Sequence, residues 1–234
     1  EALGTGNAAR IGFESIEAYD PQGAIMVTMG DKIIEPRVIE RLMSEFYEND
    51  LDLAFVVGPK EFNPAGGHVV IDDGRVCGIV ESLDIEKAKL YSHILNQLQT
   101  GGYRGIDPRK NIEEISKNII SSERKREKIV RQMESITEHL CNGETEKAIA
   151  LLKEYSVIKL GGKAYEPQFL EKAQYVNSAI YIFKSGAFKF GLSKMTTQNA
   201  DKEEYLTEAV NSICGSKEYK TSVIAVKEKE SILT

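Results

Sequence analysis

Two short apolar runs, separated by the pattern of an amphipathic helix, constrain the fold of this chain more than any other feature. Residues 24–29 (AIMVTM) are uninterruptedly apolar apart from one threonine, and Leu51–Val57 form a second run. Runs of this length are typical of strands buried inside a parallel sheet. Between them Pro36 begins a helix that we expect to end at Glu48. This alternation predicts an α/β fold with a doubly wound sheet.

Residues after the second apolar run predict further strands, beginning with a hairpin. The stretch GGHVVIDDGRVCGIVE (66–81) predicts two short strands around Asp72-Asp73-Gly74, because Asp-Gly favours hairpin turns. A strand at Tyr175–Phe183, an amphipathic helix at 203–213 and a last strand at 221–228 follow. Together these patterns predict one mixed sheet.

A helical segment interrupts this series. Asp107-Pro108 has the form of a helix N-cap followed by proline at the first helical position, and Asn142-Gly143 has the form of a C-terminal cap. We therefore predict an α/β domain made of residues 1–106 and 160–234, with residues 107–159 inserted as a helical hairpin. The basic stretch at 124–128 is best interpreted as a solvated helix face, with an anion-binding patch as the alternative.

Composition excludes several classes of protein. The 234 residues are 41% hydrophobic and 28% charged with a net charge of −6, so the chain has no basic footprint for nucleic acid. No run approaches the 18 apolar residues of a membrane span. The three cysteines, Cys77, Cys141 and Cys214, lie far apart without a C-x-x-C motif. This pattern predicts free thiols in a reducing, cytoplasmic setting.

The first ten residues, EALGTGNAAR, fit two templates. Gly4, Gly6 and Ala9 spell the G-x-G-x-x-A of a dinucleotide-binding turn, for which Asp31 would be the acid at the end of the next strand. The same letters also resemble a uracil-binding loop of the enzymes that make UDP-sugars.

Five motifs favour the second template because they occur in one order. ALGTGNAA, VTMGD, GGHVVIDDGRVCGIVE, VNSAIYIF and EEYLTEAV together resemble the sugar-phosphate nucleotidyltransferase family. The resemblance is strongest to uridyltransferase domains that make UDP-N-acetylglucosamine. It covers residues 1–81 and 175–234 and omits the helical insertion. It implies a Rossmann-like nucleotidyltransferase fold with a mixed, mostly parallel central sheet.

The resemblance also implies roles for single residues. Gly4 and Thr5 would bind the uracil base, and Asp31 would bind Mg²⁺. The sugar phosphate would be bound by Gly67, Glu81 and Asn177, with Thr207 further along the same site. Asn7, Met29, His68 and Ser178-Ala179 depart from the family pattern and leave the sugar open.

The implied reaction transfers UMP from UTP to N-acetylglucosamine-1-phosphate or a related hexosamine-1-phosphate, releasing pyrophosphate. The resemblance places the family's triphosphate loop before Glu1 and a second Mg²⁺ ligand, an asparagine, beyond Thr234. The helical insertion could serve as a surface for homo-oligomers. Two alternatives stay open: a non-catalytic module that binds nucleotide sugars or assembles with a partner, and an NAD-binding Rossmann protein.

Overall fold

The chain forms two compact units. The computed structural model describes residues 3–17, 22–103, 105–197, 203–227 and 232–233. The sheet unit contains residues 1–80, 160–162 and 173–234, and the helical unit contains residues 81–159 and 163–172. The predicted insertion begins at Asp107, whereas the helical unit already begins at Glu81.

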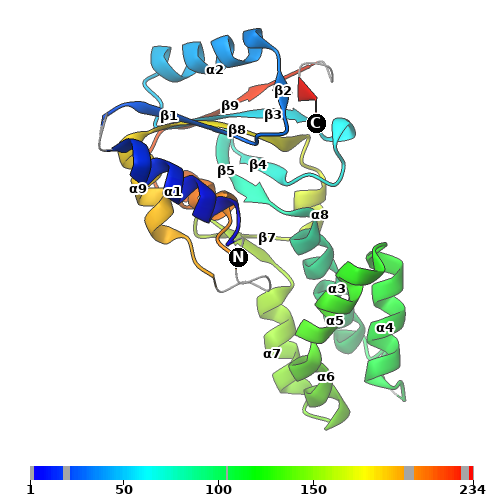
Figure 1. Cartoon of the computed structure of the whole chain (residues 1–234). Coiled ribbons are helices and arrows are strands. Elements are labelled where there is room, and N and C mark those ends of the chain that lie inside the picture. The colour runs from blue at the N-terminus through cyan, green and yellow to red at the C-terminus, as the bar shows by residue number, and fades with distance from the viewer. Residues whose placement is uncertain (1–2, 18–21, 104, 198–202, 228–231, 234) are drawn as a thin grey trace. The chain divides into compact units, whose positions relative to one another are not determined.

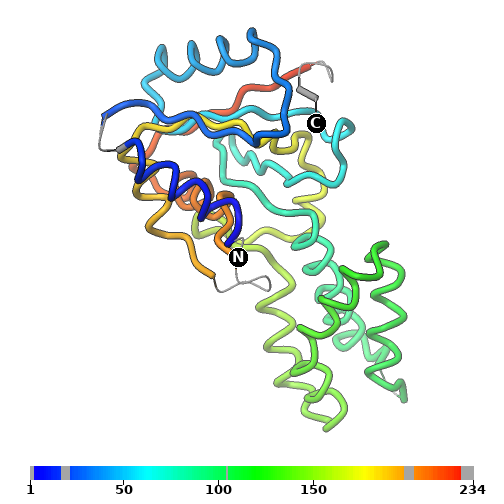
Figure 2. Tube along the Cα trace, in the orientation of Figure 1, coloured from blue at the N-terminus to red at the C-terminus, as the bar shows by residue number. Residues whose placement is uncertain are grey.

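The sheet unit is built on one mixed sheet in the order β5-β4-β8-β3-β9, with β1 also paired to β8 (Figure 1). Its strands are β1 (Ala24–Thr28), β3 (Leu53–Pro59), β4 (His68–Asp72), β5 (Arg75–Val80), β8 (Tyr175–Lys184) and β9 (Thr221–Ala225). The tube in Figure 2 shows β3 and β8 running side by side, and their register joins Leu53 to Phe183. The predicted α/β fold with a mixed sheet is confirmed.

The expectation of mostly parallel pairing is wrong. Within the described residues only β3 and β9 pair in parallel, whereas every other pair in this sheet is antiparallel. β1 is likewise not a fully buried parallel strand, since it pairs antiparallel with β8 and buries only Ile25. An apolar run reports burial but carries no information about strand direction, which the connections decide.

Helices cover both faces of this sheet (Figure 1). α2 (Pro36–Glu48) has the bounds predicted from the sequence, and it packs Val38, Leu42 and Phe46 on one face. These residues recur every four positions, as an amphipathic helix requires. The other face carries α1 (Thr5–Glu17), α9 (Ser185–Lys194) and α10 (Leu206–Gly215).

Two separate two-stranded sheets complete the described strands. One pairs β2 (Ile33–Ile34) with β10 (Ile232–Leu233), and the other pairs β6 (Ile158–Leu160) with β7 (Lys163–Tyr165). A 3₁₀ turn, η1 (Lys60–Phe62), follows β3.

The helical unit contains more helices than the predicted hairpin. They are α3 (Ser82–Gln99), α4 (Pro108–Ile119), α5 (Glu123–Gln132), α6 (Glu134–Cys141), α7 (Thr145–Tyr155) and α8 (Pro167–Glu171). Both predicted caps are confirmed: Asp107 accepts a hydrogen bond from the Arg109 N–H at 3.0 Å, and Asn142 ends α6. The predicted first helix is divided because the Ser122 hydroxyl accepts from the Lys125 N–H and starts α5.

The core of the helical unit explains why it begins before residue 107. Leu90, Tyr91 and Ile94 of α3 are buried in one cluster with Ile112 and Met133. α3 therefore belongs to the helical unit by its packing. In the described part of the chain, no helix is both long and apolar enough to cross a membrane.

Candidate functional site

Two strands, β1 and β4, pair with the same edge of β8 and leave an interruption in the strand pairing, which we call the opening. β3 follows β8 along one edge, from Tyr175 to Phe183. On the other edge β1 ends at the pair Thr28–Ile180, and β4 begins at the pair His68–Val176. Among the described strands, residues 177–179 therefore have no register partner on this edge.

Asn177 organises the backbone at this opening. Its Oδ1 accepts a hydrogen bond from the Ala179 N–H at 3.0 Å, and its Nδ2 donates to the Tyr181 hydroxyl at 2.6 Å. The Ala179 backbone adopts a φ of +54°, which is rare outside glycine, and the β3–β8 register shifts at the same place. The side chain thus holds a strained bulge, a feature that clusters at binding sites.

Of the other predicted residues, Gly67 contacts Asn177, and Asp31 follows the strand that pairs with the same edge of β8. The Gly67 carbonyl accepts from the Asn177 N–H at 2.8 Å, just before β4 begins. Gly30 and Asp31 follow β1 directly after the pair Thr28–Ile180, in a turn in which the Lys32 N–H donates to the Met29 carbonyl. Asp31 is exposed. The structure therefore brings the segments of Asp31, Gly67 and Asn177 to one opening.

The glycine loop at the N-terminus forms a separate group. The Gly6 N–H donates to the Glu204 carbonyl at 2.7 Å, and the Glu204 N–H donates to the Leu3 carbonyl at 2.8 Å. A Cβ on Gly4 or Gly6 would lie 2.5 Å or 2.9 Å from the Glu204 carbonyl oxygen, so this close approach requires glycine at both positions. The Arg10 guanidinium pairs with the Glu204 carboxylate at 2.7 Å.

Thr5 and Thr207 belong to this second group. The Thr5 hydroxyl accepts from the Leu206 N–H at 3.2 Å, at the start of α10, and Thr207 is the next residue. Two of the loop's backbone groups, at Leu3 and Gly6, are thus already paired with Glu204. The Gly4 carbonyl also accepts from the Ala8 N–H at 3.2 Å, so recognition of a base would have to use the N–H groups of Gly4 and Thr5.

Glu81 is the remaining predicted site residue. It is the exposed first residue of the helical unit and follows Val80, the register partner of His68. Glu81 therefore directly follows β5, the strand that pairs with β4.

Sequence reasoning missed three residues that organise these groups. Tyr181 is 2% exposed and packs among Phe55 and Phe183, yet its hydroxyl reaches Asn177. Its position four residues after Asn177 on one strand was the available signal, because alternate strand residues share a face. Glu204 has no such signal, since its partner Arg10 is 194 residues away in sequence. The Asn211 side chain of α10 accepts from the Ile79 N–H and donates to the Ile79 carbonyl. It therefore provides hydrogen-bond partners for the backbone of β5, the outer strand of the sheet.

Two described groups of the sheet unit with shifted pKa values, Lys184 and Cys214, lie away from the opening. Hydrogen bonding to Asp50, at 2.6 Å, raises the pKa of Lys184 at the far end of β8. Burial raises the pKa of the Cys214 thiol to about 12, so this cysteine is inert.

The donor set at the opening is compatible with a weakly held Mg²⁺ ion. Mg²⁺ keeps several waters and usually takes one or two protein carboxylates together with substrate phosphates. An exposed aspartate at the end of a strand, such as Asp31, fits that requirement. Within the described ranges, no cluster of three or more His, Cys, Asp or Glu side chains could form a fully protein-bound metal site.

No protein-family model matches the chain, and no curated protein matches it. The geometry of the sheet opening and the order of the sequence motifs are therefore the observations on which a function can be argued.

Proposed function

We propose that this chain is a sugar-1-phosphate nucleotidyltransferase with the Rossmann-like fold of that family. It transfers UMP from UTP to N-acetylglucosamine-1-phosphate or a related hexosamine-1-phosphate. One observation carries the proposal: the segments of Asp31, Gly67 and Asn177 meet at the opening between β1 and β4. Each of these residues has a role at the same site in the family that the sequence resembles.

The reaction needs positioning more than covalent chemistry. A phosphate oxygen of the sugar-1-phosphate attacks the α-phosphorus of UTP, and the bond to the β-phosphate breaks to release pyrophosphate. Mg²⁺, when bound through Asp31, supplies the positive charge that phosphoryl transfer requires. The chain's own residues orient the acceptor.

Asn177 is suited to orient the sugar phosphate. Its amide is fixed at both ends, by Ala179 and Tyr181, and it keeps a second N–H and a second lone pair for a ligand. Gly67 presents backbone without a side chain beside it, and Glu81 supplies an acceptor for sugar hydroxyls. Gly4 and Thr5 would bind the uracil, and Thr207 would bind the sugar.

We further propose that the protein works in the cytoplasm with UTP and the sugar phosphate as its small-molecule partners. The helical unit would provide any contact between copies of the chain.

The test is pyrophosphate release by the full-length protein from UTP, Mg²⁺ and hexosamine-1-phosphate. Asp31→Asn should lower the rate about a hundredfold, because Mg²⁺ loses the carboxylate ligand that would hold it beside the transferring phosphate. Asp73→Asn is the matched control, since Asp73 is an exposed aspartate at the tip of the β4–β5 hairpin. An unchanged rate in Asp31→Asn would remove that residue from the metal site.

A non-catalytic module that binds nucleotide sugars is the second candidate. This candidate predicts saturable binding of UDP-N-acetylglucosamine, measured by calorimetry, with no pyrophosphate release under any condition. The NAD-binding alternative is weaker, because β1 pairs antiparallel with its neighbour instead of continuing a parallel sheet.

A further inference from the structure

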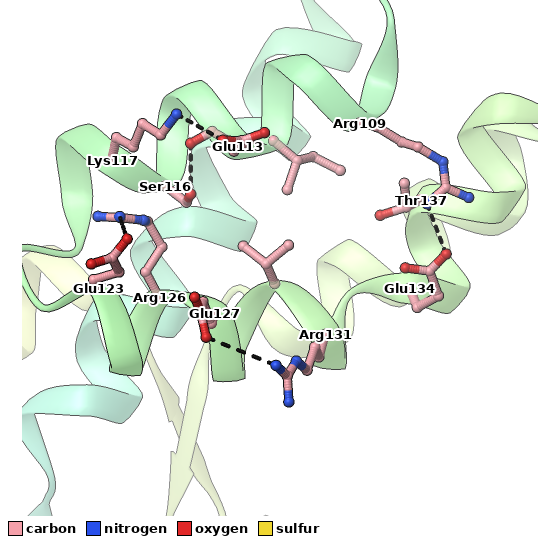
Figure 3. Close-up of a pocket in the computed structure, with 12 residues that line it drawn as sticks. Arg109, Glu113, Ser116, Lys117, Glu123, Arg126, Glu127, Arg131, Glu134 and Thr137 are labelled. Carbon is pink, nitrogen blue, oxygen red and sulfur yellow. Dashed lines mark hydrogen bonds and ion pairs between the residues drawn. The ribbon is translucent and has the colours of Figure 1, made fainter.

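A cavity of about 480 Å³ lies among α4, α5 and α6 of the helical unit (Figure 3). Ile112 and Val130 contribute apolar lining, and the hydroxyl residues Ser116 and Thr137 line it although they are almost fully buried. None of the site residues predicted from the sequence lines this cavity. Its volume falls within the range of small-molecule sites, about 300–1,000 Å³.

Most charges around the cavity are already balanced. Glu113 pairs with Lys117 at 2.7 Å, and Glu134 pairs with Arg109 at 2.9 Å. Arg131 lies 3.8 Å from Glu127, and its side chain is 83% exposed, so water solvates it.

Arg126 differs from these cations. Its side chain is only 18% exposed, and Figure 3 shows it extending from α5 toward Ser116 on α4. Its Nη1 donates to the Ile120 carbonyl at a long 3.4 Å, while the Glu123 carboxylate stays 3.9 Å from Nη2. Glu123 itself is 81% exposed and therefore solvated. A guanidinium has five N–H donors, so within the described structure Arg126 retains unused donors at the cavity.

We propose that this cavity binds a small organic anion, a carboxylate or phosphate ester on a compact apolar body, with Arg126 as its anchor. The planar guanidinium matches either anion through two parallel hydrogen bonds. The apolar body would contact Ile112 and Val130. Ser116 donates to the Glu113 carbonyl at 2.7 Å and Thr137 to the Met133 carbonyl at 2.9 Å, so these buried hydroxyls are already paired and do not compete for the anion. This site is independent of the nucleotidyltransferase proposal.

The first test titrates the ¹⁵N-labelled chain with benzoate, phenyl phosphate and benzyl alcohol. Benzoate or phenyl phosphate should shift the backbone signals of Ile112, Ser116 and Val130, and the tighter of the two identifies the preferred head group. Benzyl alcohol has the same ring without the charge and should bind about tenfold more weakly. Equal binding of all three, or shifts confined to other regions, would overturn the proposal.

The second test uses charge variants of α5 and compares their dissociation constants. Arg126→Gln should weaken binding of the anion about tenfold, whereas Arg124→Gln, an exposed arginine on the same helix outside the cavity lining, should not change it. Glu123→Gln keeps every hydrogen bond of Arg126 and removes a competing carboxylate, so it should strengthen binding about threefold. Thermal melts establish that each variant is folded. Equal losses in Arg124→Gln and Arg126→Gln, or weaker binding in Glu123→Gln, would exclude Arg126 as an anchor.

Discussion

The sheet unit and the helical unit place polar groups by different means. In the sheet unit, partners such as Arg10 and Glu204 lie far apart in sequence, and strand register sets the opening at Asn177. In the helical unit, charges pair over shorter separations in the sequence, as Glu113 does with Lys117 and Arg109 with Glu134, and these side chains stay exposed. A polar substitution should therefore cost more in the sheet unit, and matched substitutions in the two units can test this difference.

The largest expected effect compares the two cores. Phe183 in the sheet unit and Met133 in the helical unit are both fully buried, and Phe183 stacks on Phe188 with ring centroids 4.4 Å apart. Phe183→Ala should lower the free energy of unfolding by about 3–5 kcal/mol, and Met133→Ala by about 2–5 kcal/mol. Hydrogen exchange should show each loss mainly in the substituted unit. Equal loss of protection throughout the chain would mean that the two cores unfold as one.

The next largest effect compares two side-chain amides, the half-buried Asn177 of the sheet unit and the buried Asn111 of the helical unit. Asn177→Ala leaves the Ala179 N–H and the Tyr181 hydroxyl without this partner, so it should cost about 2 kcal/mol in urea denaturation. Asn111→Ala in α4 removes the hydrogen bond to Gln97 and an interaction with the Tyr103 hydroxyl, but it replaces asparagine by the best helix former. Its cost should stay below about 1 kcal/mol. Equal costs would contradict the claim that the bulge depends on Asn177.

Alkaline pH should distinguish the units with a smaller effect. Burial raises the pKa of Cys214 in the sheet unit to about 12, so above pH 9 the unfolded chain loses a proton that the folded chain keeps. The free energy of unfolding should thus fall as pH rises, by about 1 kcal/mol between pH 8 and pH 10. Burial also raises the pKa of Tyr91 in the helical unit to about 12. Tyr91 therefore lowers the free energy of unfolding as well, but only above pH 10. Cys214→Ala should flatten the slope below pH 10, and Tyr91→Phe should leave that part unchanged.

The smallest expected effect comes from the substitution of alanine by glycine, which should stabilise the protein at position 179 and destabilise it at position 150. Ala179→Gly removes the side chain that disfavours a φ of +54° and should stabilise the sheet unit by about 0.5–1 kcal/mol. Ala150→Gly in the exposed face of α7 should destabilise the helical unit by about 1 kcal/mol. Thermal unfolding measures both. Destabilisation by Ala179→Gly would mean that the left-handed backbone there carries no strain.

The sequence predicted most elements of both units, because local signals determine them. Pro36 and Asp107 marked helix starts, and Asp73-Gly74 marked the hairpin. α3 escaped prediction because its buried residues lie on more than one side of the helix, without a clean apolar stripe. α9 escaped because two glycines, Gly186 and Gly191, lower its helix propensity.

The candidate site was predictable only as a set of residue types. The position of Asp31 at a strand end followed from the apolar run before it, and the polar Asn177 within a strand signalled a special role. That β1 and β4 meet along one edge of β8 depends on pairing between residues about 150 positions apart, such as Thr28 with Ile180. Such register is set by the packed sheet as a whole and has no local signal. At the basic stretch the sequence favoured a solvated helix face and kept an anion-binding patch as the alternative, and the structure leaves the Arg126 side chain only 18% exposed.

The shared edge of β8 has a consequence for engineering this protein. Inserting or deleting one residue between Asn177 and Ile180 would reverse which side chains of β8 face each side along the whole β1 pairing. The tip of the β4–β5 hairpin, in contrast, is exposed at Asp73-Gly74 and ends in a turn that a longer loop can replace. A reporter peptide or affinity tag grafted into the sheet unit therefore belongs at the hairpin tip, and chain length should be left untouched in the middle of β8.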